Sequence, residues 1–232
     1  MNIAIIPARG GSKRIPDKNI KPFLGKPIIA YSIETAKISG LFDKIIVSTD
    51  SKEIANTAEV YGAQVPFMRP KKLSDDFTPT APVLLHALQW LEENGVSPDY
   101  VCCIYATAPF VQPDYIKKGL GLIMSKRVAS VYSVTTFPFS IFRALNISEA
   151  GCLRMFWPEH ELTRSNDLPE AYHDAGQFYW LDSKKFLNTK KIYTGDALPV
   201  ILPRGLVQDI DTSEDWETAE LIYEAAQKRG LL

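Results

Sequence analysis

The first 21 residues combine a pair of glycines with a concentration of basic side chains. The apolar run from Ile3 to Ile6 predicts a buried strand that ends in a loop around Gly10 and Gly11. Glycine lets backbone N–H groups come close to a ligand, and the charge of this loop favours an anion. The basic residues are Arg9, Lys13, Arg14, Lys18 and Lys21. We therefore expect the loop to bind a polyphosphate, although glycine turns with surface lysines also follow strands by chance.

Two carboxylates stand near the other end of the sequence, at Asp209 and Asp211. On an extended chain, residues i and i+2 project to the same face, so both carboxylates would face one ligand while Ile210 points to the core. Mg²⁺ is commonly held by one or two carboxylates, with phosphates and water as its other ligands. The alternative is that Asp211 only caps the last helix, with Thr212 and Asp215 forming a capping box.

The basic loop and the acid pair together predict transfer of a phosphoryl-type group. Such transfer depends on positioning and charge neutralisation more than on a covalent protein nucleophile. The loop matches neither the P-loop pattern Gly-x-x-x-x-Gly-Lys-Ser/Thr nor the dinucleotide pattern Gly-x-Gly-x-x-Gly. His86, His160 and His173 have no metal-ligand spacing, and no Gly-x-Ser-x-Gly elbow of a hydrolase is present.

The elements that would position these residues alternate between strand and helix. Sequence patterns predict strands at 3–6, 44–50, 64–68, 100–105, 128–134, 176–181, 199–202 and 207–211, and helices at 28–40, 51–61, 80–93, 113–125 and 213–229. This order is typical of a doubly wound α/β sandwich, in which ligands bind at the carboxyl ends of the strands. Arg9, Asp50 and Thr107 fall at such ends.

The alternation stops between residues 137 and 171. This segment is rich in proline and aromatic residues, and it is long for a simple loop in a compact domain. The aromatic residues considered exposed are Phe137, Phe139, Phe142, Phe156 and Trp157. We expect an inserted arm that packs on a second copy of the chain, because a large apolar patch needs to be covered. An internal lid is the alternative.

Length and composition restrict the remaining possibilities. The 232 residues fit a single α/β domain over 1–232. A net charge of −1 gives no general attraction to nucleic acid or to an anionic membrane, so the basic loop is a local feature. No export signal precedes the first strand, and no stretch approaches twenty consecutive apolar residues. Cys102, Cys103 and Cys152 lack metal-ligand spacing and are expected in the core of a reduced, cytoplasmic protein.

Four segments resemble one known family, the cytidylyltransferases of nine-carbon acidic sugars, or CMP-sialic acid synthetases. They lie at residues 6–19, 47–51, 106–109 and 209–212, and so extend over almost the whole chain. The resemblance implies a Rossmann-like nucleotidyltransferase fold, CTP as substrate, Mg²⁺ as cofactor and a homodimer built on the arm. It also implies the reaction, in which the anomeric hydroxyl of the sugar attacks the α-phosphorus of CTP and pyrophosphate leaves.

The resemblance assigns roles to individual residues. The expected nucleotide site consists of Ala8, Arg9, Gly10, Gly11, Ser12, Lys13, Lys18, Asn19, Thr80 and Thr107. Asp209 and Asp211 match the metal pair of the family. No residue stands out as the general base, so either Asp211 or a metal-bound water or hydroxyl could accept the proton of the attacking hydroxyl. The residues expected to act in catalysis are Arg9, Lys13, Lys18 and Asp211.

The expected sugar pocket departs from that of the sialic acid enzymes. Those enzymes typically read Leu-Gln-Pro-Thr-Ser-Pro-Leu-Arg where this chain has residues 104–111, so Tyr105 replaces a glutamine and Val111 an arginine. Residues 105–110 and 174–180 look like the pseudaminic acid cytidylyltransferases within the family, and such apolar replacements suit a deoxygenated, N-acylated sugar. The expected sugar-binding residues are Tyr105, Arg164, His173, Gln177 and Tyr179.

Other substrates and another class of protein stay open at this point. Within the family, sialic, legionaminic and 3-deoxy-octulosonic acids are the alternative sugars. Outside enzymes, the chain could be a nucleotide-binding module without catalysis. The basic loop together with the acid pair favours an enzyme, because a module that only binds does not need a metal pair beside its phosphate loop.

Overall fold

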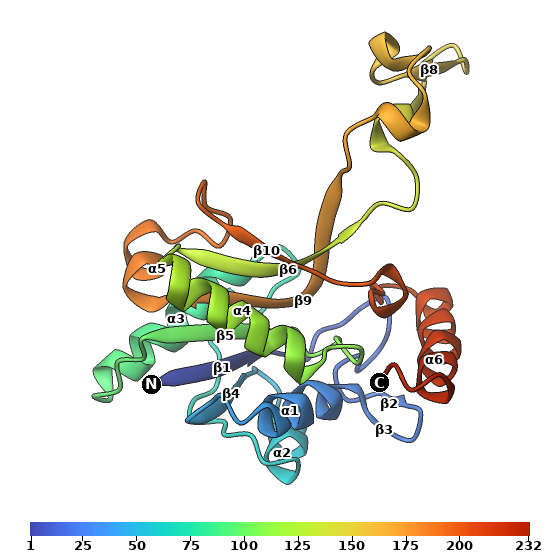
Figure 1. The fold of residues 1–232 in the computed structure, drawn as a ribbon. Coiled ribbons are helices and arrows are strands. Elements are labelled where there is room, and N and C mark those ends of the chain that lie inside the picture. Colours follow the sequence, from blue (N-terminus) through green and yellow to red (C-terminus); the bar gives the residue numbers. More distant parts are fainter.

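A six-stranded sheet forms the centre of the molecule in the computed structural model, which describes residues 1–232 (Figure 1). Its strands lie in the order β10-β6-β9-β5-β1-β4. Their bounds are β1 Asn2–Pro7, β4 Lys44–Ser48, β5 Tyr100–Ile104, β6 Ser130–Thr136, β9 Tyr172–Asp182 and β10 Leu198–Ile201. β1 is parallel to β4 and β5, and β6 is parallel to β10, whereas β9 is antiparallel to its neighbours β5 and β6. This sheet confirms the predicted α/β class.

Helices cover both faces of the sheet. Their bounds are α1 Ile28–Ser39, α2 Lys52–Val60, α3 Thr80–Glu93, α4 Pro113–Lys126, α5 Ser183–Thr189 and α6 Ser213–Lys228. One face packs against α1, α2 and α4 in an apolar core that includes Ile33 and Trp180. The other face packs against α3 and α5 in a core that includes Leu88 and Phe186. Because both faces are covered, the strands are continuous apolar runs without alternation.

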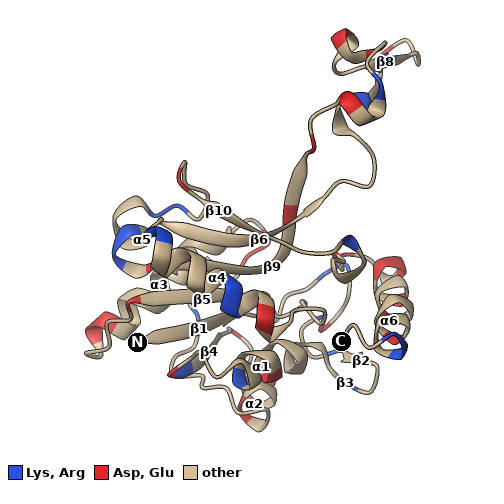
Figure 2. Cartoon of the chain, viewed as in Figure 1, with Lys and Arg blue, Asp and Glu red and all other residues tan.

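The last helix, α6, packs beside the sheet and builds a third apolar cluster. Trp216 of α6 meets Phe23 edge to face at a centroid distance of 5.6 Å. Phe23 belongs to the two-residue strand β2 (Pro22–Phe23), which pairs with β3 (Lys26–Pro27). Figure 2 shows acidic residues at the start of α6 and basic residues at its end, an arrangement that suits the helix dipole. The cluster fixes the segment before α6, which carries the acid pair.

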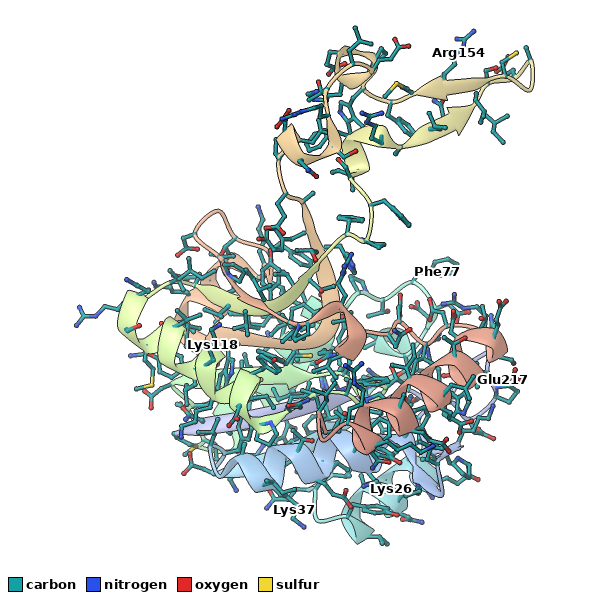
Figure 3. The ribbon with its side chains drawn as sticks, turned by 45° about the vertical axis from the view of Figure 1, so that its right-hand side comes forward. Lys26, Lys37, Phe77, Lys118, Arg154 and Glu217 are labelled. Carbon is teal, nitrogen blue, oxygen red and sulfur yellow. The ribbon has the colours of Figure 1, made fainter.

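Residues 137–171 form an arm that extends away from the rest of the molecule (Figure 1). The root of the arm is closed by a hydrogen bond of 3.2 Å from the N–H of Phe137 to the carbonyl of Ala171. Its outer part holds the antiparallel hairpin of β7 (Leu145–Ile147) and β8 (Leu153–Met155). Figure 3 shows Arg154 at this far end. The arm therefore does not lie over the body as an internal lid would.

Several segments differ from the sequence-based expectation. Residues 64–68 form only isolated bridges, because Pro66 has no N–H for a ladder. Residues 207–211 pair with no strand, β9 begins at Tyr172 instead of 176, and α5 is absent from the expected elements. Cys152 is exposed in the arm instead of buried in the core. Five single-turn helices complete the chain: η1 Lys71–Leu73, η2 Ile141–Arg143, η3 Pro158–His160, η4 Ser165–Asp167 and η5 Arg204–Leu206.

None of the helices combines the length and the apolar character that crossing a membrane requires.

Candidate active site

The first cavity, with a volume of about 260 Å³, lies at the carboxyl ends of β1 and β5. Six residues expected at the nucleotide site line it: Arg9, Ser12, Lys18, Asn19, Thr80 and Thr107. They come from the loops after β1 and β5 and from the start of α3, so the topology of the sheet brings them together. Tyr105, expected at the sugar, lines the same cavity.

The glycine loop after β1 is fixed by its own polar groups. The N–H of Gly10 donates to Oδ1 of Asp50 at 2.9 Å, and Nδ2 of Asn19 donates to the carbonyl of Arg9 at 2.9 Å. A Cβ atom on Gly10 would lie 3.0 Å from Cβ of Ser51, so this close approach to the start of α2 favours glycine. The loop is therefore shaped before any ligand binds.

One acidic side chain, Asp76, holds two cations of the loop. Its Oδ1 lies 2.5 Å from Arg9 and its Oδ2 lies 2.5 Å from Lys13. Hydrogen bonds from Lys13 and Arg9 lower the pKa of Asp76 below its ordinary value. The neighbouring Phe77 is 91% exposed and points outward in Figure 3. A triphosphate in the first cavity would compete with the Asp76 carboxylate for Arg9 and Lys13.

Lys18 connects the first loop to the segment that precedes α6. Its Nζ donates to the carbonyl of Ile210 at 2.7 Å and lies 3.3 Å from Oδ1 of Asp211. Arg14 lies 2.9 Å from the other oxygen of Asp211. Ile210 is buried in the third apolar cluster, so the acids on either side of it have defined positions.

The structure confirms the expected capping box at the start of α6 but does not make Asp211 the capping residue. The capping box of Thr212 and Asp215 forms as expected. The residue at the N-cap, however, is Thr212, and the side chain of Asp211 faces Lys18 and Arg14 instead. Asp211 is thus free to take part in a ligand site while α6 is capped by others.

The second cavity, of about 400 Å³, adjoins the first one and shares Tyr105 and Thr107 with it. His173, Asp174 and Asp209 also line it. The pKa of Asp209 is raised above its ordinary value. Desolvation is the largest cause, and repulsion from the Asp211 carboxylate is the second. The shared wall places the basic lining of the first cavity next to an acidic cavity large enough for a small ligand.

Asp209 and Asp211 fit a magnesium ion that is shared with a phosphate ligand. No group of three or more His, Cys, Asp and Glu side chains could hold a metal ion by itself. Two carboxylates are nevertheless the usual protein contribution to a magnesium site whose other ligands are phosphate oxygens and water. Asp209 is in no ion pair, whereas Asp211 pairs with Lys18 and Arg14, and burial is the main cause that raises the pKa of Asp209. A divalent cation would compensate the charge of Asp209.

A family model described as Cytidylyltransferase matches residues 3–231. The chain belongs to the cytidylyltransferase family. It is 45% identical over 222 residues to the pseudaminic acid cytidylyltransferase of Campylobacter jejuni, with 96% of each chain covered. It is also 32% identical over 229 residues to the CMP-N,N'-diacetyllegionaminic acid synthase of Legionella pneumophila, with 97% of each covered.

A solved structure shares the fold of this cytidylyltransferase at low sequence identity. It is that of CMP:2-keto-3-deoxy-manno-octonic acid synthetase complexed with CTP, with a TM-score of 0.70 and 15% identity. The match covers 97% of this chain and 98% of the other. At this identity the likeness establishes the fold alone.

Some residues expected at the sugar of this cytidylyltransferase lie elsewhere. Gln177 is buried and donates to the carbonyl of Leu206, and Tyr179 is buried with its hydroxyl on Asp174. Val111 is buried in the core and lines neither cavity. In this structure the polar groups of Gln177 and Tyr179 bond within the protein, and a sugar contact by either stays a prediction. Of the expected sugar-binding residues, Tyr105 and His173 line the cavities.

Four other expected site residues, Arg164, Ala8, Gly11 and Lys13, line neither of the two cavities. Arg164 lies on the arm, where it pairs with Asp167 at 2.8 Å, and it does not reach the cavities of its own chain. Ala8 is buried beneath the glycine loop. Gly11 is exposed, and a Cβ atom at this position would meet no heavy atom within 4 Å. Lys13 stays largely exposed beside Asp76.

Arg69 is a functional candidate that sequence reasoning misses. It lines the first cavity although it is only 5% exposed, and its Nε and one Nη have no hydrogen-bond partner. Its closest carboxylate is Asp50, 3.8 Å away. Burial lowers the pKa of Arg69 below its ordinary value. A buried cation with free donors beside a basic loop is suited to bind an anion, and no local pattern around residue 69 reveals it.

Replacing Arg69 by methionine is expected to weaken CTP binding by about ten- to a hundredfold, because charge-assisted hydrogen bonds to the nucleotide are lost. The melting temperature should stay the same or rise, since the substitution removes a poorly paired buried charge. Isothermal titration with CTP and thermal unfolding measure the two quantities. Unchanged affinity with a lower melting temperature would mean that Arg69 serves only to hold Asp50.

Proposed function

We propose that this chain couples CTP to pseudaminic acid, giving CMP-pseudaminic acid and pyrophosphate. The observation that carries the proposal is the pair of adjoining cavities that share Tyr105 and Thr107. One is lined by the basic loop and Arg69, and the other ends at Asp209. Identity of 45% along 96% of both chains to a pseudaminic acid cytidylyltransferase supports this choice of sugar.

The first cavity binds the triphosphate and the second binds the sugar acid. The anomeric hydroxyl oxygen forms a bond to the α-phosphorus, while the bond from that phosphorus to the bridging oxygen of the leaving pyrophosphate breaks. Arg9, Lys18 and Arg69 face the phosphates from the first cavity and neutralise the charge that grows on pyrophosphate. Holding both substrates against the shared wall makes the attack effectively intramolecular.

Magnesium is part of this proposal, with Asp209 and Asp211 as the residues that would hold it. When bound, the ion neutralises phosphate charge and orients the triphosphate for in-line displacement. Lys18 and Arg14 contact Asp211 and hold that carboxylate in place, and Lys18 itself lines the first cavity.

The chain offers Nε2 of His173 as the acceptor of the hydroxyl proton. Nδ1 of His173 lies 2.8 Å from the carbonyl of Asp174. Because a carbonyl only accepts, Nδ1 carries the proton and Nε2 is left as an acceptor in the second cavity. Asp211, the other residue considered for this role, is assigned to the metal in this proposal and lies against Lys18 and Arg14.

Replacing His173 by asparagine is expected to lower kcat by about a hundredfold with little change in either KM. The asparagine amide can still donate to the Asp174 carbonyl, so the substitution removes the acceptor and keeps the local structure. Steady-state pyrophosphate release measures the effect. A kcat within threefold of the wild type would exclude His173 as the base.

A third cavity, of about 550 Å³, supports an N-acylated sugar. It shares Tyr105 and Thr80 with the first cavity and is bounded by Ala81, Ile192 and Tyr193. Such an apolar surface suits acyl or methyl groups. A sugar without them, such as 3-deoxy-octulosonic acid, would leave this surface uncovered.

We also propose that the arm makes a homodimer. Its exposed apolar residues include Phe139, Ile147, Leu153 and Leu162, which are 66–94% exposed in the single chain. A sugar contact by Arg164 would need the cavity of a second copy, because Arg164 does not reach those of its own chain. The buried, unpaired Cys102 and Cys103 fit the expected cytoplasmic location, which stays a prediction.

Replacing Ile147 by glutamate is expected to convert the dimer to a monomer, because a charge would enter the apolar interface. Light scattering after size-exclusion chromatography measures the mass. Ile38→Glu, at an equally exposed position on α1, is the control and should stay dimeric. A wild-type protein that is monomeric at micromolar concentration would refute this part of the proposal.

The test of the function is pyrophosphate release from CTP and Mg²⁺ with pseudaminic, legionaminic, N-acetylneuraminic and 3-deoxy-octulosonic acids in parallel. Turnover with pseudaminic acid alone is the expected result. Turnover only with another acid would keep the reaction and reject the sugar. If the protein binds CTP but releases no pyrophosphate with any of the four acids, the non-catalytic module is favoured.

A further inference from the structure

Asp174 lies in an irregular part of β9 that borders the second cavity. The pairing of β6 with β9 passes from Tyr132–Tyr179 to Val134–Asp174. Residues 175–178 of β9 therefore stand opposite the single residue 133 of β6. Bulges of this kind redirect side chains and are frequent next to active sites.

The bulge is built into the fold and is internally satisfied. Gly176 takes the left-handed conformation at φ +62°, which favours glycine. The hydroxyl of Ser133 accepts the N–H groups of Gln177 and Phe178, at 3.4 and 3.1 Å. Ser133 is fully buried, so these bonds hold the backbone around Asp174 firmly.

Three protein donors orient the carboxylate of Asp174. The N–H of Gly176 donates to Oδ1 at 2.8 Å, and the hydroxyl of Tyr179 lies 2.9 Å from both oxygens. The hydroxyl of Tyr193 donates to Oδ2 at 2.6 Å, and Tyr193 in turn lines the third cavity. A carboxylate has about four acceptor positions, so about one remains for a ligand.

The charge of the second cavity restricts how a sugar acid can lie in it. Its lining includes two carboxylates, Asp174 and Asp209, and no lysine or arginine. A metal ion at Asp209 would offset the charge at one end and leave that of Asp174 at the other. The carboxylate of the sugar would be repelled there, whereas an N–H or O–H donor would be attracted.

We propose that Asp174 is a specificity-determining residue of the sugar site. Its free acceptor position takes an acylamino N–H or a hydroxyl of the sugar, and its charge directs the sugar carboxylate away from the bulge. Through Tyr193 it also positions one wall of the third cavity. This inference rests on the proposed function and adds to it the residue that selects the orientation of the sugar.

The experiment compares the wild type, Asp174→Asn and Asp182→Asn with CTP, Mg²⁺ and either pseudaminic or N-acetylneuraminic acid. For Asp174→Asn we expect the KM for pseudaminic acid to rise at least tenfold and the preference for it over N-acetylneuraminic acid to fall by about as much. The KM for CTP should stay within twofold. Asp182→Asn is the matched control, because Asp182 lies on the same strand but caps α5. It should keep every constant within twofold.

The experiment distinguishes failure of the proposed function from failure of the role of Asp174. No turnover by the wild type with any sugar contradicts the proposed function, whereas wild-type turnover with an unchanged sugar KM in Asp174→Asn overturns the inference alone. A parallel loss of kcat, both affinities and melting temperature would mean a merely structural role and also overturns it. If Asp174→Asn does not fold, the wild type decides. An analogue with an ammonium group in place of an acylamino group should then bind at least fivefold more tightly than the analogue with a hydroxyl group there, which also lacks the acyl group. Equal or weaker binding overturns the inference.

Discussion

Replacing Asp211 by asparagine is expected to lower kcat/KM by about a thousandfold while the protein stays folded. The substitution removes one of the two carboxylates suited to magnesium and leaves Lys18 without its acidic partner. The side chain of Asp211 is 36% exposed, and α6 is capped by Thr212 and Asp215, so little packing is lost. Steady-state assays at increasing Mg²⁺ should show that the variant needs a higher concentration for half of its residual activity.

Asp215→Asn is the control for this variant. Asp215 is another carboxylate of the same segment, but it accepts from the N–H of Thr212 and stabilises the start of α6. Its loss should lower the melting temperature and leave kcat/KM within a few-fold. Near-normal activity of Asp211→Asn would reject the metal assignment, and equal losses in the two variants would trace both effects to the start of α6.

Replacing Lys18 by methionine is expected to lower kcat/KM by at least a hundredfold. The ammonium group lies in the first cavity, is only 20% exposed, and bonds both the Ile210 carbonyl and Asp211. Methionine keeps the apolar stem but removes the charge that we propose faces the phosphates, together with the link between the first loop and the segment before α6. Titration with CTP and single-turnover assays would separate lost binding from lost chemistry.

Lys21→Met provides the comparison for Lys18. Lys21 belongs to the same basic run, but its ammonium lies 4.5 Å from the ring centre of Trp216, outside the first cavity. Its activity should stay within threefold of the wild type. If Lys18→Met behaves in the same way, the basic loop is a surface feature and not the phosphate site.

The sequence predicts the α/β class and most strands because buried strands between helices are continuous apolar runs. For the same reason, the sequence does not predict that β9 runs antiparallel to its neighbours or which of its side chains point to which face of the sheet. Gln177 and Tyr179 fall within a run in which every residue from 177 to 181 is buried, so no alternation indicates which of them face a ligand. The bulge at Asp174 depends on pairing with Ser133, which is distant in sequence.

The basic loop and the acid pair could be located because each is a local pattern of charged residues. Arg69 could not, since its role follows from burial beside a loop that lies sixty residues earlier in the chain. Arg164 shows a different limit of sequence-based prediction: it is expected near the sugar, but it lies on the arm and lines neither cavity. A match of residue type at an expected position does not say which cavity, or which copy of the chain, the side chain can reach.

The bond from Lys18 to Ile210 spans 192 residues, and this separation has a consequence for synthesis on the ribosome. At typical elongation rates of about 5–20 residues per second, the basic loop exists for roughly 10 to 40 s before its acidic partner is made. During that time Phe23 also lacks Trp216, its partner in the third cluster. A nascent chain is therefore inactive, and an incomplete one displays an uncovered aromatic surface by which chaperones and proteases can distinguish it from the finished enzyme.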